Sequence, residues 1–216
     1  MATITVVGGT GYAGGSIARE AARRGHTVVS FSRTVPEGDA RIDGVRYETG
    51  SMLDAEARDR AVTGSDVVVS ALAPRGELDG RIVEADDALA ALALERGVRL
   101  GVVGGFSSLR GAEGAPRFAE TGDLPPEFAS EALQMNEVLT HLLGSQDALD
   151  WFFVSPAMQF GSYAPGEALG RYRVGGEVAL FDEAGVSAVS GADFALAVVD
   201  EIETPAHRRA QFGVAY

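Results

Sequence analysis

Three regularly spaced glycines follow a short apolar run, residues 4–7, near the start of the chain. They are Gly8, Gly11 and Gly14. The first glycine permits a tight turn, the second lets the backbone approach a ligand, and the third lets a following helix pack closely. Backbone N–H groups at the start of such a helix attract phosphate. The alternative is a glycine-rich turn without a ligand. The strand before and the helix after favour a pyrophosphate site, with contacts from Gly8, Thr10, Gly11, Tyr12, Ala13 and Gly14.

The end of the second strand-like run indicates which dinucleotide would bind. An NAD-selective site places a carboxylate there to accept a hydrogen bond from the ribose 2′-hydroxyl. This chain has Ser32 and Arg33 instead. Because a guanidinium pairs with phosphate, the pattern predicts NADP(H), with NAD(H) possible. The alternative for Arg33 is a solvated charge at the end of a strand.

The residues that the chain lacks exclude several chemistries. All 18 basic residues are arginine, and cysteine is absent, so lysine-dependent steps, disulfides and thiolate sites are excluded. His26, His141 and His207 are scattered, and we expect no metal site. The net charge of −13 disfavours nucleic acid and membrane surfaces as partners. The chain shows no signal peptide and no apolar run near the ~20 residues of a membrane span, so we expect a cytoplasmic protein.

Strand-like and helical segments alternate along the chain. We predict strands at residues 4–7, 27–32, 45–48, 66–72, 98–103, 151–155 and 211–215, and helices at 11–24, 54–62, 82–96, 127–143 and 190–203. Ser190 and Asp193 have the spacing of a capping box at the start of the last helix. This order predicts an α/β fold, a doubly wound Rossmann-type parallel sheet. We expect one domain over residues 1–216, with a small substrate-side segment at about 156–216.

The glycine motif and several later segments resemble a known group. The later segments are residues 102–105, 107–109, 125–128, 155–157, 171–176 and 212–216. Together they resemble the atypical short-chain dehydrogenase/reductases, in particular the small NAD(P)H-binding proteins described as NADH-flavin reductases, which are similar to biliverdin/flavin reductase B. The resemblance covers essentially the whole chain.

The resemblance also implies where the cofactor lies. It places the adenine against Met52 and Leu53, and the nicotinamide ribose over the segment Ser70, Ala71, Leu72 and Ala73. It places the nicotinamide beside the residues that follow the fifth and sixth strands, which are Gly104, Gly105, Ser155 and Pro156. The chain departs from the wider superfamily because its Tyr–x–x–x–Lys pair is missing.

The remaining chemistry is hydride transfer to an acceptor that needs no strong protein acid. A flavin, as substrate, or a similar quinone-like acceptor meets this condition. We expect this planar small molecule to be lined by Phe106, Met158, Phe160, Tyr163 and Tyr172, although ordinary packing also explains each of them. Ser107 is the candidate catalytic residue, with a loop or cap hydroxyl as its alternative.

Two other functions stay open at this point. A non-catalytic NADP(H) sensor of the NmrA-like type would share the fold and also lack the Tyr–Lys pair. A sugar-nucleotide epimerase is disfavoured by that missing pair and by a short C-terminal part. The pattern gives no expectation for the oligomeric state.

Overall fold

The computed structural model describes all 216 residues and contains one eight-stranded sheet. The spatial order of the strands is β3-β2-β1-β4-β5-β6-β8-β7. The mutually parallel strands are β1 (Thr3–Val7), β2 (Thr27–Ser32), β3 (Val45–Thr49), β4 (Val67–Ser70), β5 (Arg99–Val103), β6 (Trp151–Pro156) and β8 (Ala210–Ala215). The predicted doubly wound parallel sheet is confirmed.

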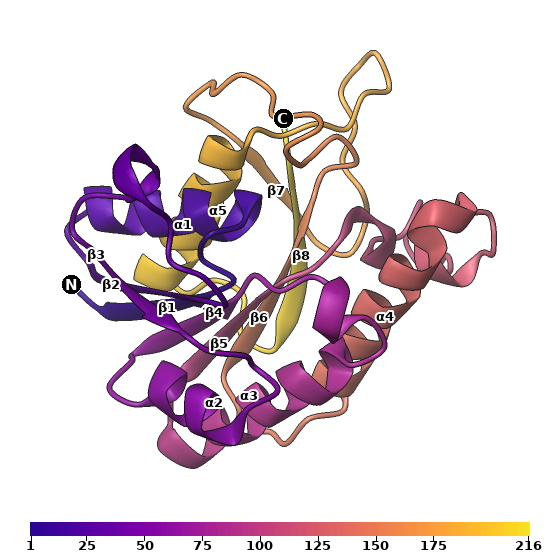
Figure 1. The fold of residues 1–216 in the computed structure, drawn as a ribbon. Coiled ribbons are helices and arrows are strands. Elements are labelled where there is room, and N and C mark those ends of the chain that lie inside the picture. Colours follow the sequence, from indigo (N-terminus) through magenta and orange to yellow (C-terminus); the bar gives the residue numbers. More distant parts are fainter.

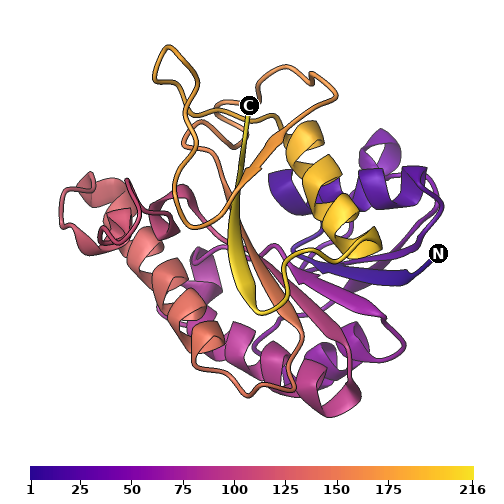
Figure 2. The ribbon, with the colours of Figure 1, turned by 180° about the vertical axis from the view of Figure 1, so that it is seen from behind.

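Five helices cover the two faces of the sheet. They are α1 (Tyr12–Arg23), α2 (Ala55–Val62), α3 (Ile82–Arg96), α4 (Pro126–Leu143) and α5 (Gly191–Glu203). Figure 1 shows α1 and α5 together on one face and α2, α3 and α4 on the other, and Figure 2 shows the same layers from behind. None of the helices combines the length and apolar character needed to cross a bilayer.

Alternate residues of the strands fill two separate hydrophobic cores. In β6, Phe152 and Val154 pack in the core with α1 and α5, whereas Trp151 and Phe153 pack in the core with α2, α3 and α4. Every residue of β6 is buried, which explains why its sequence is a continuous apolar run.

The strand order places a crevice beside β1. The chain proceeds from β1 outward through β2 to β3, and then crosses to β4 on the other side of β1. In open α/β sheets the connections after the strands diverge at such a point, and ligands bind at the carboxyl ends of the strands there. The glycine turn after β1 lies at this position.

One strand was not predicted. Residues 156–185 lack a clear periodic pattern, yet β7 (Arg173–Gly175) pairs antiparallel with β8 at the edge of the sheet. The strand has three residues, too few for an alternation of apolar and polar side chains to be visible. Half of the predicted capping box is present, because the Ser190 side chain accepts a hydrogen bond from the Asp193 backbone N–H. The reciprocal bond is missing, since the Ser190 backbone N–H donates to the Tyr216 hydroxyl.

Candidate functional site: a nucleotide pocket at the glycine turn

The glycine turn after β1 requires glycine at three of its positions, which are Gly8, Gly9 and Gly14. Gly8 has a φ of 77°, and a Cβ there would lie 2.5 Å from the carbonyl oxygen of Ala71. A Cβ on Gly14 would lie 2.3 Å from the carbonyl oxygen of Gly8. The first glycine thus allows the turn and the close approach of β4. The third lets α1 start directly against the turn itself.

The N-terminus of α1 is free to bind an anion. Its N-cap residue is Gly11, which provides no side-chain hydrogen bond, and no acidic residue occupies the first turn. The first N–H groups of a helix have no partner within it, and they carry its positive end. This turn therefore fits the pyrophosphate of a dinucleotide.

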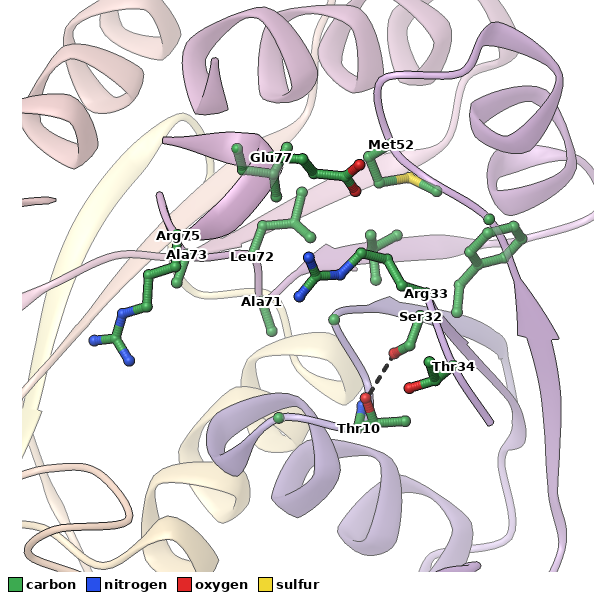
Figure 3. Close-up of a pocket in the computed structure, with 16 residues that line it drawn as sticks. Thr10, Ser32, Arg33, Thr34, Met52, Ala71, Leu72, Ala73, Arg75 and Glu77 are labelled. Carbon is green, nitrogen blue, oxygen red and sulfur yellow. Dashed lines mark hydrogen bonds between the residues drawn. The ribbon is translucent and has the colours of Figure 1, made fainter. Parts of the chain in front are cut away.

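A cavity of about 250 Å³ opens beside this turn, at the carboxyl ends of β1, β2, β3 and β4 (Figure 3). Its lining residues are Val7, Gly8, Thr10, Gly11, Phe31, Ser32, Arg33, Thr34, Gly50, Met52, Ala71, Leu72, Ala73, Arg75, Glu77 and Leu78. We call it the nucleotide pocket.

Half of the predicted cofactor-binding residues line the nucleotide pocket. These are Gly8, Thr10, Gly11, Ser32, Arg33, Met52, Ala71 and Leu72. The other eight lie outside its lining: Tyr12, Ala13, Gly14, Leu53, Gly104, Gly105, Ser155 and Pro156. Tyr12 to Gly14 form the adjacent first turn of α1. Leu53 packs at the edge of the core beneath Met52.

The polar side chains of the pocket differ in how they are held. The Ser32 hydroxyl accepts a hydrogen bond from the Thr10 backbone N–H at 3.2 Å, which joins the end of β2 to the glycine turn. Arg33 extends across the opening toward the one-turn 3₁₀ helix Gly76–Leu78, with Nη1 3.3 Å from the position of a Cβ on Gly76. The second guanidinium, Arg75, donates to Glu131 of α4 at 3.0 and 3.2 Å.

The segment from Arg75 to Leu78 was missed as part of the pocket. It contributes Arg75, Glu77 and Leu78 to the lining, beside Ala73, which was expected near the nucleotide. The segment lies shortly after β4, so the rule that ligands bind after the carboxyl ends of parallel strands could have found it. Its residue types carry no motif, and sequence reasoning stopped at Ala73.

The segments after β5 and β6 are shaped mainly by packing. A Cβ on Gly104 would lie 2.0 Å from the Phe153 ring, so glycine is required there by that ring. Gly105 has open space beside it. Ser155 is fully buried, and its hydroxyl accepts a hydrogen bond from the Gln211 amide at 2.9 Å. Pro156 is also buried. Because little of either residue is exposed, Ser155 and Pro156 could contact only the edge of a bound ligand.

Ser107, the candidate catalytic residue, lies half-buried in the one-turn 3₁₀ helix Phe106–Ser108 after β5. Two hydrogen bonds hold this turn in place. Gln211 Nε2 donates to the Ser108 carbonyl oxygen at 3.0 Å, and Arg117 donates to the same oxygen. Arg117 is itself buried. The surroundings would hold Ser107 in one position, and its catalytic role stays a prediction.

The five residues expected to line an acceptor are in different environments. Phe106 stacks on Phe118 with ring centroids 5.0 Å apart, and Phe160 packs edge-on against Tyr12 at 5.1 Å. The hydroxyl of Tyr172 donates to Asp200, and burial together with this carboxylate raises the pKa of Tyr172 to about 12. Met158 and Tyr163 are 52% and 75% exposed. No aromatic pair joins two of these residues, and a shared acceptor pocket stays a prediction.

Comparison with known proteins gives a family. The model of the NAD(P)H-binding family matches residues 8–205. The chain is 32% identical over 213 residues to the uncharacterized protein YwnB of Bacillus subtilis, covering 98% of this chain and 97% of YwnB.

Solved structures share the fold over the full length. A crystal structure named as a putative NADH-flavin reductase, from Streptococcus pneumoniae, is 29% identical with a TM-score of 0.86, covering 100% of this chain and 99% of that one. A protein from Burkholderia pseudomallei, named as an exported protein, is 37% identical with a TM-score of 0.86 and full coverage of both chains. A short-chain dehydrogenase/reductase from Veillonella parvula in complex with NADP, 16% identical with a TM-score of 0.73, covers 100% of this chain and 94% of its own and shares the fold alone.

The glycine turn, the open start of α1 and the nucleotide pocket are the features that NAD(P)H binding requires, and the family match spans all of them. The chain belongs to the NAD(P)H-binding family and has the Rossmann fold of the atypical short-chain dehydrogenase/reductases.

Proposed function

We propose that this protein is an NADPH-dependent oxidoreductase that delivers hydride to a flavin or a similar planar, quinone-like acceptor. The observation that carries the proposal is the nucleotide pocket at the glycine turn, with Arg33 and no carboxylate at the end of β2, in a chain without lysine. The similarity to a protein named as an NADH-flavin reductase supports the acceptor class.

The residues that line the nucleotide pocket fit the adenosine and pyrophosphate part of the nucleotide. Phe31 and Met52 offer an apolar surface for the adenine, and Arg33 offers a guanidinium for a 2′-phosphate. The N–H groups at the start of α1 bind the pyrophosphate. The bound nicotinamide nucleotide supplies the hydride. We propose that the rest of the nucleotide extends along Ala71 to Ala73, which line the pocket after β4.

The chain contributes orientation more than proton transfer. There is no lysine, and no tyrosine occurs between Tyr47 and Tyr163, so α4 carries no Tyr–Lys pair. A flavin or quinone spreads the incoming charge over its ring system, and water can supply the proton. Holding donor and acceptor in contact can lower the barrier by several kcal/mol. We propose that Ser107 donates a hydrogen bond to the acceptor or to the nicotinamide amide, and that residues 156–216 form the acceptor side.

The test follows the loss of NADPH absorbance in the near ultraviolet with FMN, riboflavin and a soluble quinone. Turnover with at least one of these acceptors is expected. Ser107→Ala should lower kcat. The Kd of NADPH, measured by its fluorescence, should stay unchanged if Ser107 contacts the acceptor and rise if it contacts the nicotinamide amide. Tight NADPH binding without turnover on any acceptor would overturn the proposal.

A non-catalytic NADP(H) sensor is the second candidate. The observation that favours it is the packing of the expected acceptor residues, because Phe160 lies against Tyr12 and Phe194, and the Tyr172 hydroxyl is held by Asp200. A sensor would bind NADPH and NADP⁺ with different affinities and turn over neither. The same assay therefore separates the two functions.

We also propose a cytoplasmic location with a small molecule as the partner. The proposal rests on the negative charge of the chain, which disfavours anionic surfaces. Cell fractionation of the producing organism tests it, and recovery of the protein outside the cytoplasm would contradict it.

A further inference from the structure

Glu77 is the only carboxylate among the residues that line the nucleotide pocket. It lies in the one-turn 3₁₀ helix Gly76–Leu78 that follows β4. Glu77 is exposed. Beside an anionic ligand its carboxylate adds repulsion, which a hydrogen bond from a donor on that ligand would offset.

The Glu77 carboxylate is oriented by a short chain of hydrogen bonds. The backbone N–H of Leu53 donates to the Ser51 hydroxyl at 3.2 Å, and the Ser51 hydroxyl donates to Glu77 Oε1 at 3.0 Å. Because the hydroxyl already accepts from an N–H, its own proton points to the carboxylate. One carboxylate oxygen is thus fixed, and the other is free to accept from a ligand.

The fixed oxygen places Glu77 at the apolar part of the pocket. Ser51 stands between Gly50 and Met52, which both line the pocket, and the side chains of Phe31, Met52 and Leu78 are buried around it. Figure 3 shows the Glu77 carboxylate near Met52, with the Arg33 guanidinium between it and Thr10 of the glycine turn. An apolar niche with one polar acceptor suits a flat aromatic base with one amino group.

The geometry points to Glu77 as the residue that recognises the exocyclic 6-amino group of the adenine, with Ser51 as its positioning residue. The inference rests on nicotinamide nucleotide binding in this pocket. The adenosine ribose has two further donors at this end. In NADP(H) its 2′-hydroxyl carries the phosphate to which Arg33 is available, and its 3′-hydroxyl stays free. Replacing the 6-amino group alters neither hydroxyl, so the base comparison distinguishes the 6-amino group from the 3′-hydroxyl. The nearby Arg33 charge also offsets the repulsion between Glu77 and the nucleotide's phosphates.

The test compares nucleotides that differ at this amino group and at the adjacent ring nitrogen N1. Hypoxanthine dinucleotides carry a 6-oxo group, an acceptor that faces the carboxylate unfavourably, and a proton on N1. We expect the protein to bind NADPH about tenfold or more tightly than its hypoxanthine analogue, measured by nucleotide fluorescence. Glu77→Gln should reduce this preference to within about threefold, because a glutamine amide can turn its N–H₂ toward the 6-oxo group.

Glu84→Gln is the matched control, since Glu84 is an exposed glutamate on α3 paired with Arg81 at 2.9 Å, outside the pocket lining. It should keep the preference unchanged. Equal binding of both bases by the unaltered protein, or a preference that survives Glu77→Gln, would overturn the inference. A loss in Glu77→Gln confined to NADH, with NADPH unaffected, would also overturn it and assign Glu77 to the ribose hydroxyl.

The outcome is separable from that of the proposed function. Base preference with no turnover on any acceptor keeps Glu77 as the adenine-recognising residue and removes the oxidoreductase proposal. Turnover without a base preference keeps the oxidoreductase proposal and removes Glu77 as the adenine-recognising residue. A protein that binds no nicotinamide nucleotide contradicts both.

Discussion

Arg33 lies on the lining of the nucleotide pocket, where it forms no ion pair with any carboxylate. Most other arginines of the chain are held by glutamate or aspartate, as Arg75 is by Glu131. The Arg33 guanidinium can therefore pair with a phosphate of the ligand without first breaking an ion pair within the protein. Charge-assisted hydrogen bonds to a phosphate contribute about 1.5–3 kcal/mol, which corresponds to roughly one to two orders of magnitude in affinity.

Arg33→Ala should therefore weaken NADPH binding by roughly ten- to a hundredfold and change NADH binding far less. Calorimetric titration with both nucleotides measures the difference. Arg19→Ala, an exposed arginine on α1, is the control and should leave both affinities unchanged. Equal losses for NADPH and NADH would show that Arg33 does not contact the 2′-phosphate.

Individual residues differ in how well the sequence predicts their place. Gly8 and Gly14 were predictable because no side chain fits their positions, and the reason is local to the turn. Gly104 was expected beside the nicotinamide, yet its missing side chain makes room for Phe153 of β6, a residue far along the chain. Glu77 carries no motif. Its place depends on a hydrogen bond with Ser51, which only the folded chain brings near.

At the scale of elements, β4 and α3 are joined by a buried polar pair. The Ser70 hydroxyl at the end of β4 donates to Asp86 Oδ1 of α3 at 2.6 Å, and the other oxygen of Asp86 has no partner. Burial raises the pKa of Asp86 to about 7, from the usual 3.8. Between pH 3.8 and about pH 7, Asp86 is therefore mostly protonated in the folded protein and mostly ionised in the unfolded chain.

This pair predicts a pH dependence of stability. Because the folded pKa of Asp86 is the higher one, its contribution to stability is complete below pH 3.8 and declines as the pH rises to about 7. Asp86→Asn should remove this decline, since an asparagine accepts the same hydrogen bond without ionising. Denaturant unfolding of both proteins across this range measures it. Parallel pH profiles would contradict the prediction.

The contact between α1 and α5 includes a charge network with the opposite pH dependence. Arg24 at the end of α1 pairs with Glu20, Asp200 and Glu203, each at 2.6 Å. The Arg24 hydrogen bond is the main cause that lowers the pKa of Glu203 below its usual 4.5. A carboxylate whose pKa is lowered by folding stabilises the folded state above pH 4.5. This stabilisation is lost as the pH falls through the pKa of the folded state.

Arg24→Met should therefore lower Tm by roughly 2–8 °C at neutral pH. The Tm difference between Arg24→Met and the unaltered protein should narrow as the pH falls below 4.5. Glu203 then becomes protonated first in the unfolded chain and, at its lowered pKa, in the folded protein. Calorimetric scans at several pH values measure it. A Tm difference that is constant with pH would show that Arg24 stabilises by packing alone.

At the scale of the whole molecule, the strand order and both helical layers could be predicted because period and connection rules repeat along the chain. The segment between β6 and α5 could not. Its β7 strand is fixed by pairing with β8, and the turn at Pro165 is held by a hydrogen bond from Tyr12. Such long-range contacts leave no periodic trace in the sequence. Tyr12, predicted as a cofactor contact, is one of the residues that join the two halves.

The Tyr12 hydroxyl connects the glycine turn to the C-terminal part of the chain. It donates to the Pro165 carbonyl oxygen at 2.9 Å and accepts from the Gly191 backbone N–H at 2.8 Å. The following residues of this segment are held by Asp193, which accepts from the N–H groups of Leu169 and Gly170. Segment 165–170 is thus anchored at one end by the residue that starts α1 beside the pyrophosphate site.

Tyr12→Phe should lower the free energy of unfolding by about 1–3 kcal/mol, because the buried Gly191 N–H loses its acceptor. Amide exchange at residues 166–170 should accelerate, while the Kd of NADPH should stay within about threefold, since the backbone N–H of Tyr12 is retained. Tyr163→Phe is the matched control, because the exposed Tyr163 hydroxyl forms no hydrogen bond within the chain. Unchanged exchange in Tyr12→Phe would mean that Asp193 alone holds the segment, and that the nucleotide turn and the C-terminal half are not coupled through this hydroxyl.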